Sequence, residues 1–511
     1  MKKILFSLVA FSLAGIAAAQ TQAPAIEWQK CLGGSGGDMA SSIQQTSDGG
    51  YIVAGITNSN DGDVSGNHGN SDGWVVKLNP SGEIDWQKCL GGSDYDSASS
   101  IQQTSDGGYI VAGRTSSNDG DVSGNHGGNS DGWVVKLDAS GAVQWQKCLG
   151  GSNSEVFNAI QQTSDGGYIV AGYTNSNDGD VSGNHGSDDF WVVKLNASGE
   201  LLWQKCLGGS GQDSVYSIQQ TSDGGYIAAG FTTSNDGDVS GFHGGYYDGW
   251  VVKLDASGNL LWQKCLGGSG FEDWAYSIQQ TSDGGYIVAG YTSSNDGDVS
   301  GFHGGYDGWV VKLDTSGKLL WQKCLGGSDW DFLYSIQQTS DGGYIVAGYT
   351  ISNDGDVSEN NGNYHEAWIV KLDASENLLW QKCLGGSYYE VFNSIQQTSD
   401  GGYIVAGFTN SYDGDVSGNH GDLDGWVVKL APDNLGTEEL SVNAKIGVYP
   451  NPVRDVLHFT SKEPVLKAEI FDLNGRLIKT AEVFNNQLSV SSLSKGIYFL
   501  NLQTAKEKLK T

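Results

Sequence analysis

Arginine is almost absent from most of this 511-residue chain. Residues 24–430 contain one arginine, Arg114, and 16 basic residues against 50 acidic ones, whereas residues 441–511 carry 10 basic and 6 acidic residues. Nucleic acids and anionic lipids are bound through clusters of Lys and Arg, which the acidic segment lacks. We therefore expect no nucleic-acid partner for residues 24–430 and a surface that attracts cations.

Long apolar runs are missing after the first twenty residues. No later segment offers 18 uncharged apolar residues, so we expect no transmembrane helix in the mature chain. The beginning combines two lysines, an apolar run over residues 4–16 and three alanines before Gln20. This order is typical of a secretory signal peptide, which we predict at residues 1–19, with a mature protein outside the cytoplasm.

Proline is scarce too, with 6 residues against 77 glycines, which indicates short elements joined by tight turns. The string WQKCLGG starts at seven tryptophans spaced by 58 or 59 residues: Trp28, Trp86, Trp145, Trp203, Trp262, Trp321 and Trp380. Repeats of this length indicate an architecture built from identical modules. The chain therefore contains seven units.

Each unit holds four β-type runs, which in the second unit are SIQQT, YIVAGRT, GWVVKL and AVQWQKCL. The turn segments SDGG and DASG and one long polar loop separate them. Four strands per unit are typical of a propeller blade, so we predict an all-β, seven-bladed β-propeller over residues 24–430. The last unit lacks its fourth strand, and we expect residues 26–32 to supply it and close the ring.

Two local motifs resemble known propellers. The TSDGGYIV turn, with Asp48 and Gly50, resembles the Asp-box of sialidases, in which the carboxylate accepts backbone N–H bonds. Sialidase chemistry is excluded because it needs a cluster of arginines. The WVVKLDASGNLLWQ segments resemble the hairpins of tryptophan-docking propellers such as the quinoprotein family, in architecture only.

Cysteine occurs once per unit, at the same strand position: Cys31, Cys89, Cys148, Cys206, Cys265, Cys324 and Cys383. An odd number cannot pair completely, and no CxxC or Cys/His ligand spacing is present. Equivalent positions in neighbouring blades lie too far apart for a disulfide. We predict small buried thiols.

The long loop, SNDGDVSGNHG in the first unit, is the most acidic part of each repeat. Asp61, Asp63 and Ser65 followed by a glycine match the D-x-D-x-S-G start of a calcium loop, and Asp72 lies near the closing position. A second carboxylate follows each GGS as the third residue, at Asp38, Asp96, Glu155, Asp213, Glu272, Asp331 and Glu390. These groups predict either calcium sites or a hydrogen-bonded turn network.

The equivalent aspartates of the other six loops belong to the same prediction: Asp119, Asp121, Asp178, Asp180, Asp236, Asp238, Asp296, Asp298, Asp354, Asp356, Asp413 and Asp415. A histidine also recurs in six of the loops, at His68, His126, His185, His243, His303 and His420. The sixth loop lacks it. We therefore expect a structural or solvent-facing role for these histidines rather than a metal or catalytic one.

Aromatic residues break the repeat, chiefly after GGS. The candidates for a ligand-binding rim are Tyr95, Phe157, Tyr216, Phe271, Trp274, Trp330, Tyr388 and Tyr389, and Phe242 is one of three further aromatics in the long loops. Aromatic rings beside carboxylates suit sugars, through stacking and hydroxyl hydrogen bonds. The alternative is packing between neighbouring loops.

The tail is a separate domain, predicted at residues 443–511 after a linker at 431–442. Its motifs are Pro450-Asn451-Pro452, then Asp472, Gly475 and Arg476, then Leu493, Gly496 and Tyr498. These residues resemble the type A C-terminal sorting domain of Bacteroidetes type IX secretion cargo. The resemblance implies a small Ig-like sandwich, interaction with the type IX secretion machinery, and release or attachment at the outer cell surface.

We expect a secreted or cell-surface, non-enzymatic propeller that binds an extracellular glycan or protein, with loops stabilised either by calcium or by their own hydrogen bonds. A secreted hydrolase and a structural surface-layer component are the alternatives. Catalysis needs one distinct set of nucleophile, base and orienting group. The polar residues here recur sevenfold instead, which argues against the hydrolase.

Overall fold

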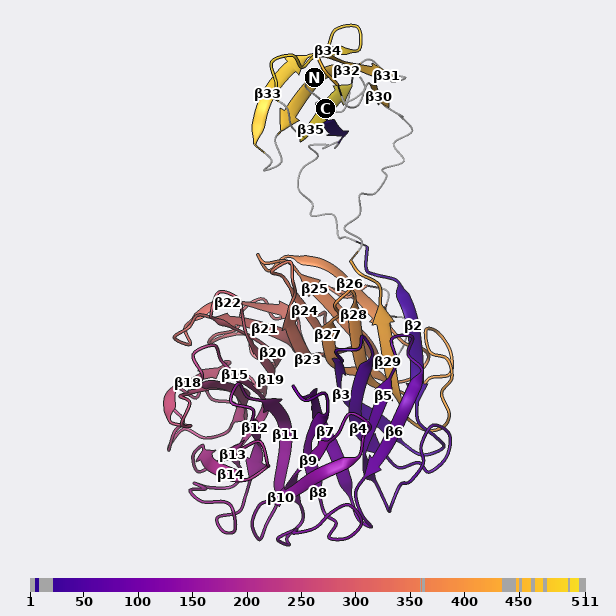
Figure 1. Ribbon diagram of the computed structural model, residues 1–511. Helices are drawn as coiled ribbons and strands as arrows, with labels where there is room; N and C mark the ends of the chain where they lie inside the picture. Colours follow the sequence, from indigo (N-terminus) through magenta and orange to yellow (C-terminus); the bar gives the residue numbers. More distant parts are fainter. Residues whose placement is uncertain are drawn as a thin grey trace. The chain divides into compact units, whose positions relative to one another are not determined.

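The computed structural model describes residues 5–8, 22–358, 360, 364–433, 447–449, 453–460, 465–471, 476–494 and 497–504. The chain divides into two compact units (Figure 1): Gln20–Asn434 forms one, and Met1–Ala19 with Leu435–Thr511 forms the other. Every regular element among the described residues is a β-strand. No helix in that part of the chain could cross a membrane.

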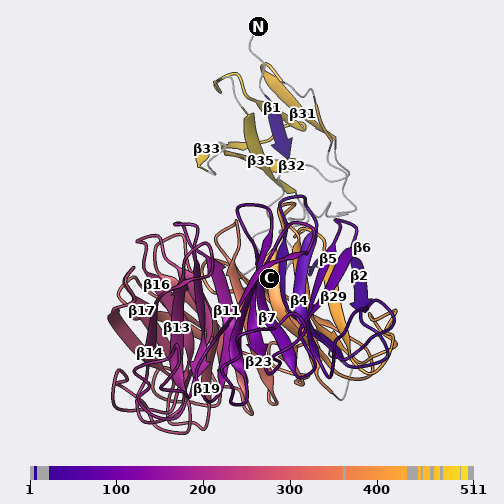
Figure 2. The same cartoon turned by 60° about the horizontal axis from the view of Figure 1, so that its bottom comes forward.

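The larger unit is a seven-bladed β-propeller, as the repeats predict. Seven four-stranded antiparallel sheets follow one another around a central axis in chain order (Figure 1), and their loops extend beyond the strand ends (Figure 2). The innermost strands are β3 (Asp38–Gln45), β7 (Asp96–Gln103), β11 (Glu155–Gln162), β15 (Asp213–Gln220), β19 (Asp273–Gln280), β23 (Asp331–Gln338) and β27 (Glu390–Gln397).

The second strands are fully apolar in their middle: β4 (Tyr51–Thr57), β8 (Tyr109–Thr115), β12 (Tyr168–Thr174), β16 (Tyr226–Thr232), β20 (Tyr286–Thr292), β24 (Tyr344–Thr350) and β28 (Tyr403–Thr409). The third strands are β5 (Asp72–Leu78), β9 (Asp131–Leu137), β13 (Asp189–Leu195), β17 (Asp248–Leu254), β21 (Asp307–Leu313), β25 (Glu366–Leu372) and β29 (Asp424–Leu430). The outer strands are β2 (Ile26–Leu32), β6 (Ile84–Leu90), β10 (Val143–Leu149), β14 (Leu201–Leu207), β18 (Leu260–Leu266), β22 (Leu319–Leu325) and β26 (Leu378–Leu384).

The inner strands begin four residues earlier than the SIQQT pattern predicts. In the second unit β7 starts at Asp96, and its pairing with β8 shifts at a β-bulge between Ala98 and Ser100. The bulge adds one residue that the partner strand does not match, which interrupts the regular alternation of side chains. This is why the first half of the strand is not evident from the sequence.

The ring closes through its two ends. β2 completes the seventh blade, whose strand order is β2-β29-β28-β27. Ile26 pairs with Leu430 and Leu32 with Gly425, and the Ala431 N–H donates to the Ala25 carbonyl at 2.9 Å. The predicted closure by residues 26–32 is confirmed, and no blade is left with an unpaired third strand.

The hydrophobic core lies between neighbouring blades. Ile52 and Val75 of the first unit pack with Tyr109 and Trp133 of the second in one buried cluster. The outer-strand Trp86 reaches across to the same neighbour, with its ring 5.7 Å from that of Tyr109. Each blade therefore stabilises the next, because the repeated residues form the same contacts at each interface between blades.

Two glutamines at the end of each inner strand also join the blades. The Gln44 Oε1 accepts the backbone N–H of Gln103 in the following blade at 2.7 Å. The Gln103 Oε1 accepts the N–H of Ser47 in the preceding blade at 2.8 Å. All seven junctions repeat both bonds, including the junction between the last unit and the first. The IQQT segment is thus a circular inter-blade connection.

The smaller unit contains two sheets around one core. One sheet has the order β1 (Leu5–Leu8), β35 (Ile497–Thr504), β32 (Val465–Phe471) and β33 (Leu477–Glu482), and the other has β30 (Gly447–Tyr449), β31 (Val456–Thr460) and β34 (Gln487–Ser489). Leu457, Ile470 and Leu500 lie in the core between them. Apart from β1, residues 1–21 lie outside the described residues, so the signal peptide stays a prediction.

Candidate functional site

The acidic loops start with an aspartate that caps the neighbouring GGS turn. The Asp61 Oδ1 accepts the Ser35 N–H at 2.7 Å, and hydrogen bonding to Ser35 lowers the pKa of Asp61. The same bond, at 2.6 to 2.8 Å, recurs at Asp119, Asp178, Asp236, Asp296, Asp354 and Asp413. The Ser65 hydroxyl contacts the outer strand instead, where its Oγ accepts a hydrogen bond from Gln87 Nε2 at 2.7 Å.

The second aspartate of each loop is half-buried, except the exposed Asp415. Asp121 and Asp298 form ion pairs with Lys88 and Lys264 at 3.6 and 3.0 Å. An Oδ2 contacts a glycine N–H at 3.3 or 3.4 Å in Asp180, Asp238, Asp356 and Asp415. The Oδ2 of Asp63 is buried without a hydrogen-bond partner among the described residues. These carboxylates thus have different environments from blade to blade.

The carboxylate after GGS is a buried cap. The Asp38 Oδ2 accepts from the Gly34 N–H at 2.8 Å and from the Ser59 hydroxyl at 2.6 Å, and Oδ1 accepts from Thr57 Oγ1. In the fifth unit the structure corrects the sequence prediction. Asp273, not Glu272, takes this place, because one extra residue in the preceding turn shifts the strand start by one position.

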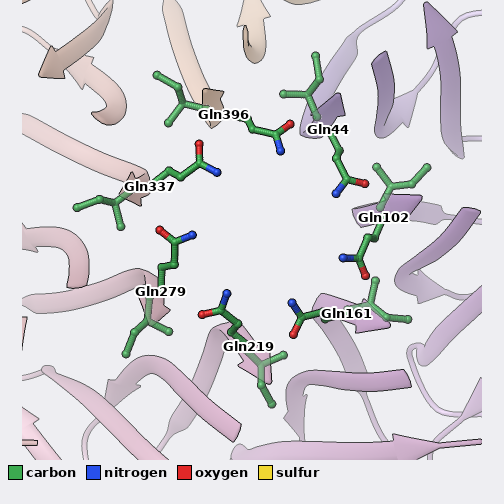
Figure 3. A pocket seen from close by; sticks show the side chains of 14 residues that line it. Gln44, Gln102, Gln161, Gln219, Gln279, Gln337 and Gln396 are labelled. Atoms are coloured by element: carbon green, nitrogen blue, oxygen red, sulfur yellow. The ribbon is translucent and has the colours of Figure 1, made fainter. Parts of the chain in front are cut away.

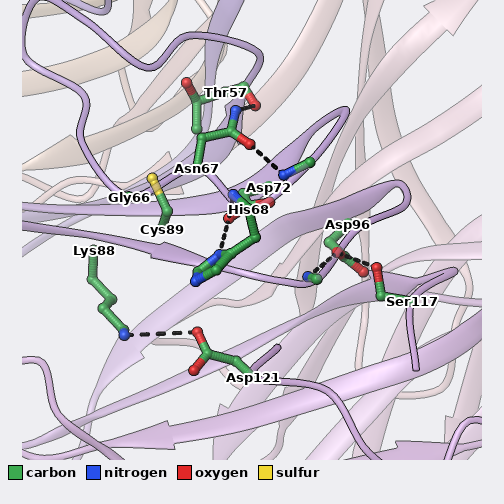
Figure 4. A network of polar contacts seen from close by, with 12 residues as sticks. Thr57, Gly66, Asn67, His68, Asp72, Lys88, Cys89, Asp96, Ser117 and Asp121 are labelled. Carbon is green, nitrogen blue, oxygen red and sulfur yellow. Dashed lines mark hydrogen bonds and ion pairs between the residues drawn. The ribbon is translucent and has the colours of Figure 1, made fainter. Parts of the chain in front are cut away.

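The recurrent histidines pair with the carboxylate that starts the third strand. The Nδ1 atom of His68 lies 2.6 Å from Asp72 Oδ2 (Figure 4). Five further pairs have distances of 2.6 or 2.7 Å, at His126, His185, His243, His303 and His420. Burial raises the pKa of Asp72, which the hydrogen bonds from His68 offset in part. These contacts give the histidines a structural role, which is one of the two roles expected from the sequence.

The two buried carboxylates meet across blade boundaries, not within one loop. A Cβ placed on Gly91 would lie 2.9 Å from Asp72 Oδ1 and 2.5 Å from Asp96 Oδ2. The charge of Asp96 adds to the raised pKa of Asp72. Figure 4 shows Asp72 with His68 and Asp96 with Ser117 side by side. Asp72 therefore faces Asp96 of the next blade.

These contacts bear on the calcium prediction. No group of three or more His, Cys, Asp or Glu side chains with the geometry of a metal site is found among the described residues. A calcium ion would have to replace the bonds that Asp61 and Ser65 make to the protein. The alternative turn network is present: the Asn60 side chain accepts from Gly66 N–H, and Asn67 Nδ2 donates to the Ser59 carbonyl. Calcium binding stays a prediction.

Half of the eight predicted rim residues lie at the surface. Phe271, Trp330, Tyr388 and Tyr389 are exposed, whereas Tyr95 is half-buried and lies 4.5 Å from the Arg114 guanidinium. Phe157 does not belong to the rim. It is completely buried and stacks on Trp191 at 5.0 Å, because its ring fills the space beside Gly132.

Tyr216 and Trp274 belong to an aromatic cluster over three adjacent blades. Tyr216, Tyr276 and Tyr334 occupy the bulge position of three successive inner strands, with ring centroids 4.8 and 4.9 Å apart. Trp274 packs on Phe231 at 4.3 Å. The first units carry Ser41 and Ser99 at the bulge position. The loop face is thus aromatic in one sector and small and polar in another.

A pocket of about 390 Å³ adjoins this aromatic sector. Ser187, Gln212, Thr233, Phe242 and Tyr246 are among its lining residues. Tyr246 is 51% exposed and stacks on Phe271 of the next blade, with centroids 5.5 Å apart and an angle of 18° between the rings. The sequence interpretation missed Tyr246. The doubled tyrosine in GGYYDGW, which no other loop has, was the available signal.

The remaining motifs are structural. The Asp48 Oδ1 accepts the Gly50 N–H at 2.9 Å, as predicted for the Asp-box turn. Burial disfavours its charge, but bonds from Thr46, Gly50 and Lys77 outweigh this and lower the pKa of Asp48 to about 2. None of the seven cysteines forms a disulfide, and all are buried except the half-buried Cys383. The prediction of buried thiols is confirmed for six of them.

The sorting motif lies only partly within the described residues. Pro450, Asn451, Pro452, Asp472, Gly475 and Gly496 are outside them. Arg476 directly precedes β33, and Tyr498 lies in β35 with a buried side chain whose hydroxyl donates to the Ser494 carbonyl at 3.1 Å. Tyr498 thus ties the start of the last strand to the turn before it.

Comparisons with known proteins identify this smaller unit. Residues 447–511 match the family model described as "Secretion system C-terminal sorting domain". A 70-residue stretch is 36% identical to Beta-agarase D of Zobellia galactanivorans, covering 13% of this chain and 14% of that protein. The chain thus spans about a seventh of the length of that relative.

Solved structures resemble the chain at low identity. Sqt1 from Chaetomium thermophilum has a TM-score of 0.38 and 12% identity, with 89% of this chain and 100% of that chain covered. BBS1N in complex with ARL6DN has a TM-score of 0.41 and 10% identity, with 82% and 100% covered. Residues 447–511 belong to the C-terminal sorting domains of type IX secretion, and the chain is a seven-bladed β-propeller protein that is exported to the cell surface or secreted.

Proposed function

We propose that the exported propeller is a non-enzymatic binding protein that takes a carbohydrate on its aromatic loop face. The observation that carries the proposal is the exposed ring pair Tyr246 and Phe271 beside the pocket of about 390 Å³. Sugar rings stack on flat aromatic faces through their C–H groups, and their hydroxyls need hydrogen-bonding partners nearby. Gln212 and Thr233 in the pocket lining offer such partners.

The distribution of polar groups supports binding over catalysis. The His–Asp pairs recur in six blades with nearly the same distance. The bond from the first loop aspartate to the GGS turn recurs in all seven. Groups that recur around a ring stabilise it, whereas a catalytic centre needs one place that differs chemically from the others. What differs between blades is the aromatic sector, whose rings supply contact area and no acid, base or nucleophile.

A glycan array with the purified propeller, residues 22–433, tests the proposal. We expect selective binding of a set of related glycans, lost at least tenfold in Tyr246→Ala and in Phe271→Ala. Tyr412→Ala is the matched control, because Tyr412 is an equally exposed aromatic residue in the seventh blade. Release of shortened glycan during the assay would indicate a hydrolase. Absence of binding to all glycans, or equal loss in the control, would contradict the carbohydrate proposal and favour a protein ligand or a structural surface role.

A further inference from the structure

A cavity of about 240 Å³ lies on the axis of the propeller, lined by the first glutamine of every IQQT segment and the isoleucine before it. Figure 3 shows the seven glutamines, Gln44 in the first unit and its equivalents, converging from seven inner strands. They are half-buried, so solvent reaches them. The cavity is separate from the loop face, because Gln44 lies six residues along β3 from Asp38, roughly 20 Å at the rise of a strand.

The orientation of each amide is dictated by the backbone. The Gln44 Oε1 accepts a hydrogen bond from the Gln103 N–H. In a side-chain amide only the oxygen can accept a hydrogen bond, and the nitrogen can only donate. The same bond at 2.6 or 2.7 Å holds the other six glutamines. The Nε2 groups must therefore point away from the strands, and in Figure 3 they turn toward the axis. Among the described residues no oxygen accepts from these seven nitrogens.

The result is a ring of N–H donors that has no matching acceptor among the residues that the structure describes. A neutral ring of this kind is complementary to a negatively charged oxygen, because charge-assisted hydrogen bonds are stronger than neutral ones. The carboxylates nearest in sequence do not oppose this. Asp48 is paired with the buried Lys77 at 3.0 Å, and the aspartate of every other TSDGG turn has the equivalent lysine within 3.0 Å.

We propose that the axial cavity binds a small oxyanion, such as sulfate, phosphate or a carboxylate, through the seven inward-facing glutamine amides. The anion would bridge N–H groups of several blades at once and so stabilise the closed ring. The acidic surface of the propeller repels anions elsewhere. An anion is therefore bound only at the axis, where N–H donors converge and the neighbouring carboxylates are paired with lysines.

Isothermal titration calorimetry of the propeller with sulfate, phosphate and acetate tests the proposal, with chloride at equal ionic strength as the reference. The test variant is Gln102→Glu/Gln219→Glu/Gln337→Glu. Glutamate keeps the oxygen that accepts the backbone N–H and replaces the inward N–H group by a second oxygen. The control is Gln103→Glu/Gln220→Glu/Gln338→Glu, which adds the same charge at the adjacent residues that contact the turns and do not line the cavity.

We expect the native protein and the control to bind one oxyanion per propeller at millimolar concentration or below, and the test variant to bind at least tenfold more weakly. Melting curves of all three proteins in sulfate separate this binding from the general stabilisation that sulfate gives to any protein, which the control retains. No binding by the native protein would overturn the proposal. Equal binding by the test variant, or equal loss in the control, would do so as well, since the amide ring would then not be what holds the anion.

Discussion

The indole of Trp262, in the outer strand of the fourth blade, lies against Gly317 in the hairpin of the fifth, so that a Cβ on Gly317 would come 2.7 Å from the ring. The same glycine occurs at Gly82, Gly141, Gly199 and Gly258, always with positive φ. In the sixth unit Glu376 stands there with φ 63°.

Glu376→Gly should therefore stabilise the propeller by about 1 kcal/mol, because left-handed backbone is costly for a residue with a Cβ and free for glycine. Denaturant unfolding of the two proteins measures the difference. Gly317→Glu is the reverse control and should destabilise, since its Cβ also collides with Trp262. A less stable Glu376→Gly protein would show that contacts of the glutamate outweigh the backbone strain.

Ring closure by β2 should determine the stability of the whole propeller. Deleting residues 21–33 uncovers the edge of β29 and the core around Trp426, so the melting temperature should fall severely. A control protein that carries residues 26–32 after Leu430, joined by an Asp-Ala-Ser-Gly turn, rebuilds the seventh blade within one segment and should recover most of the loss. An unchanged melting temperature after the deletion would show that β2 is not needed to close the ring.

Stability should peak in mildly acidic solution. Burial raises the pKa of Asp248 and Asp307 to about 6, although hydrogen bonds from His243 and His303 lower it in part. The folded state then holds protons that the unfolded chain, with a pKa of about 3.9, has released. This contribution is complete below about pH 4 and is lost as pH rises from there through 6. The pKa of His126 is also raised, because its bond to Asp131 outweighs the effect of burial. This stabilising contribution is likewise lost as pH rises.

The opposite limb comes from the Asp-box turns, where the pKa of Asp106, Asp165 and Asp223 is lowered to about 2 as the bonds to Thr, Gly and Lys outweigh burial. That stability is lost as pH falls from about 4 through 2. Melting temperatures should therefore be highest near pH 4, where the two limbs meet. Asp248→Asn should flatten the decline above pH 4, and the exposed Asp255→Asn should not. A melting temperature that still rises between pH 5 and 8 would contradict this.

The thiols should be inert in the folded protein. Burial, with nearby aspartates, raises the pKa of Cys31, Cys89, Cys148, Cys206, Cys265 and Cys324 to about 12. Since only the thiolate reacts, a thiol reagent at pH 8 should label the half-buried Cys383 and leave the other six until denaturant is added. Rapid labelling of several cysteines in the native state would show that the blades open readily.

Calcium binding by the loops is testable at Asp63, whose buried Oδ2 lacks a hydrogen-bond partner among the described residues. Calcium should raise the melting temperature and chelator lower it, and Asp63→Ala should remove about one of several ions. Asp138→Ala is the control, because Asp138 lies in a hairpin turn outside these loops and its Oδ1 accepts from the Ser140 and Ala142 N–H groups. Calorimetry without calcium binding, together with a melt unaffected by chelator, would leave the loops as hydrogen-bonded turns.

The sequence by itself determined the number of blades, the four strands of each and the closing strand, because turn chemistry and a strict repeat are local and every copy reports the same arrangement. The sorting domain was equally evident from its motifs. The tertiary structure decided what depends on neighbours. Phe157 is core because Gly132 leaves room for its ring, Asp72 meets Asp96 because blades abut, and Asp273 replaces Glu272 because an inserted residue shifts the strand. The inward amides of Gln44 and its equivalents are visible only once the ring is closed, since the bond that orients each one comes from another blade.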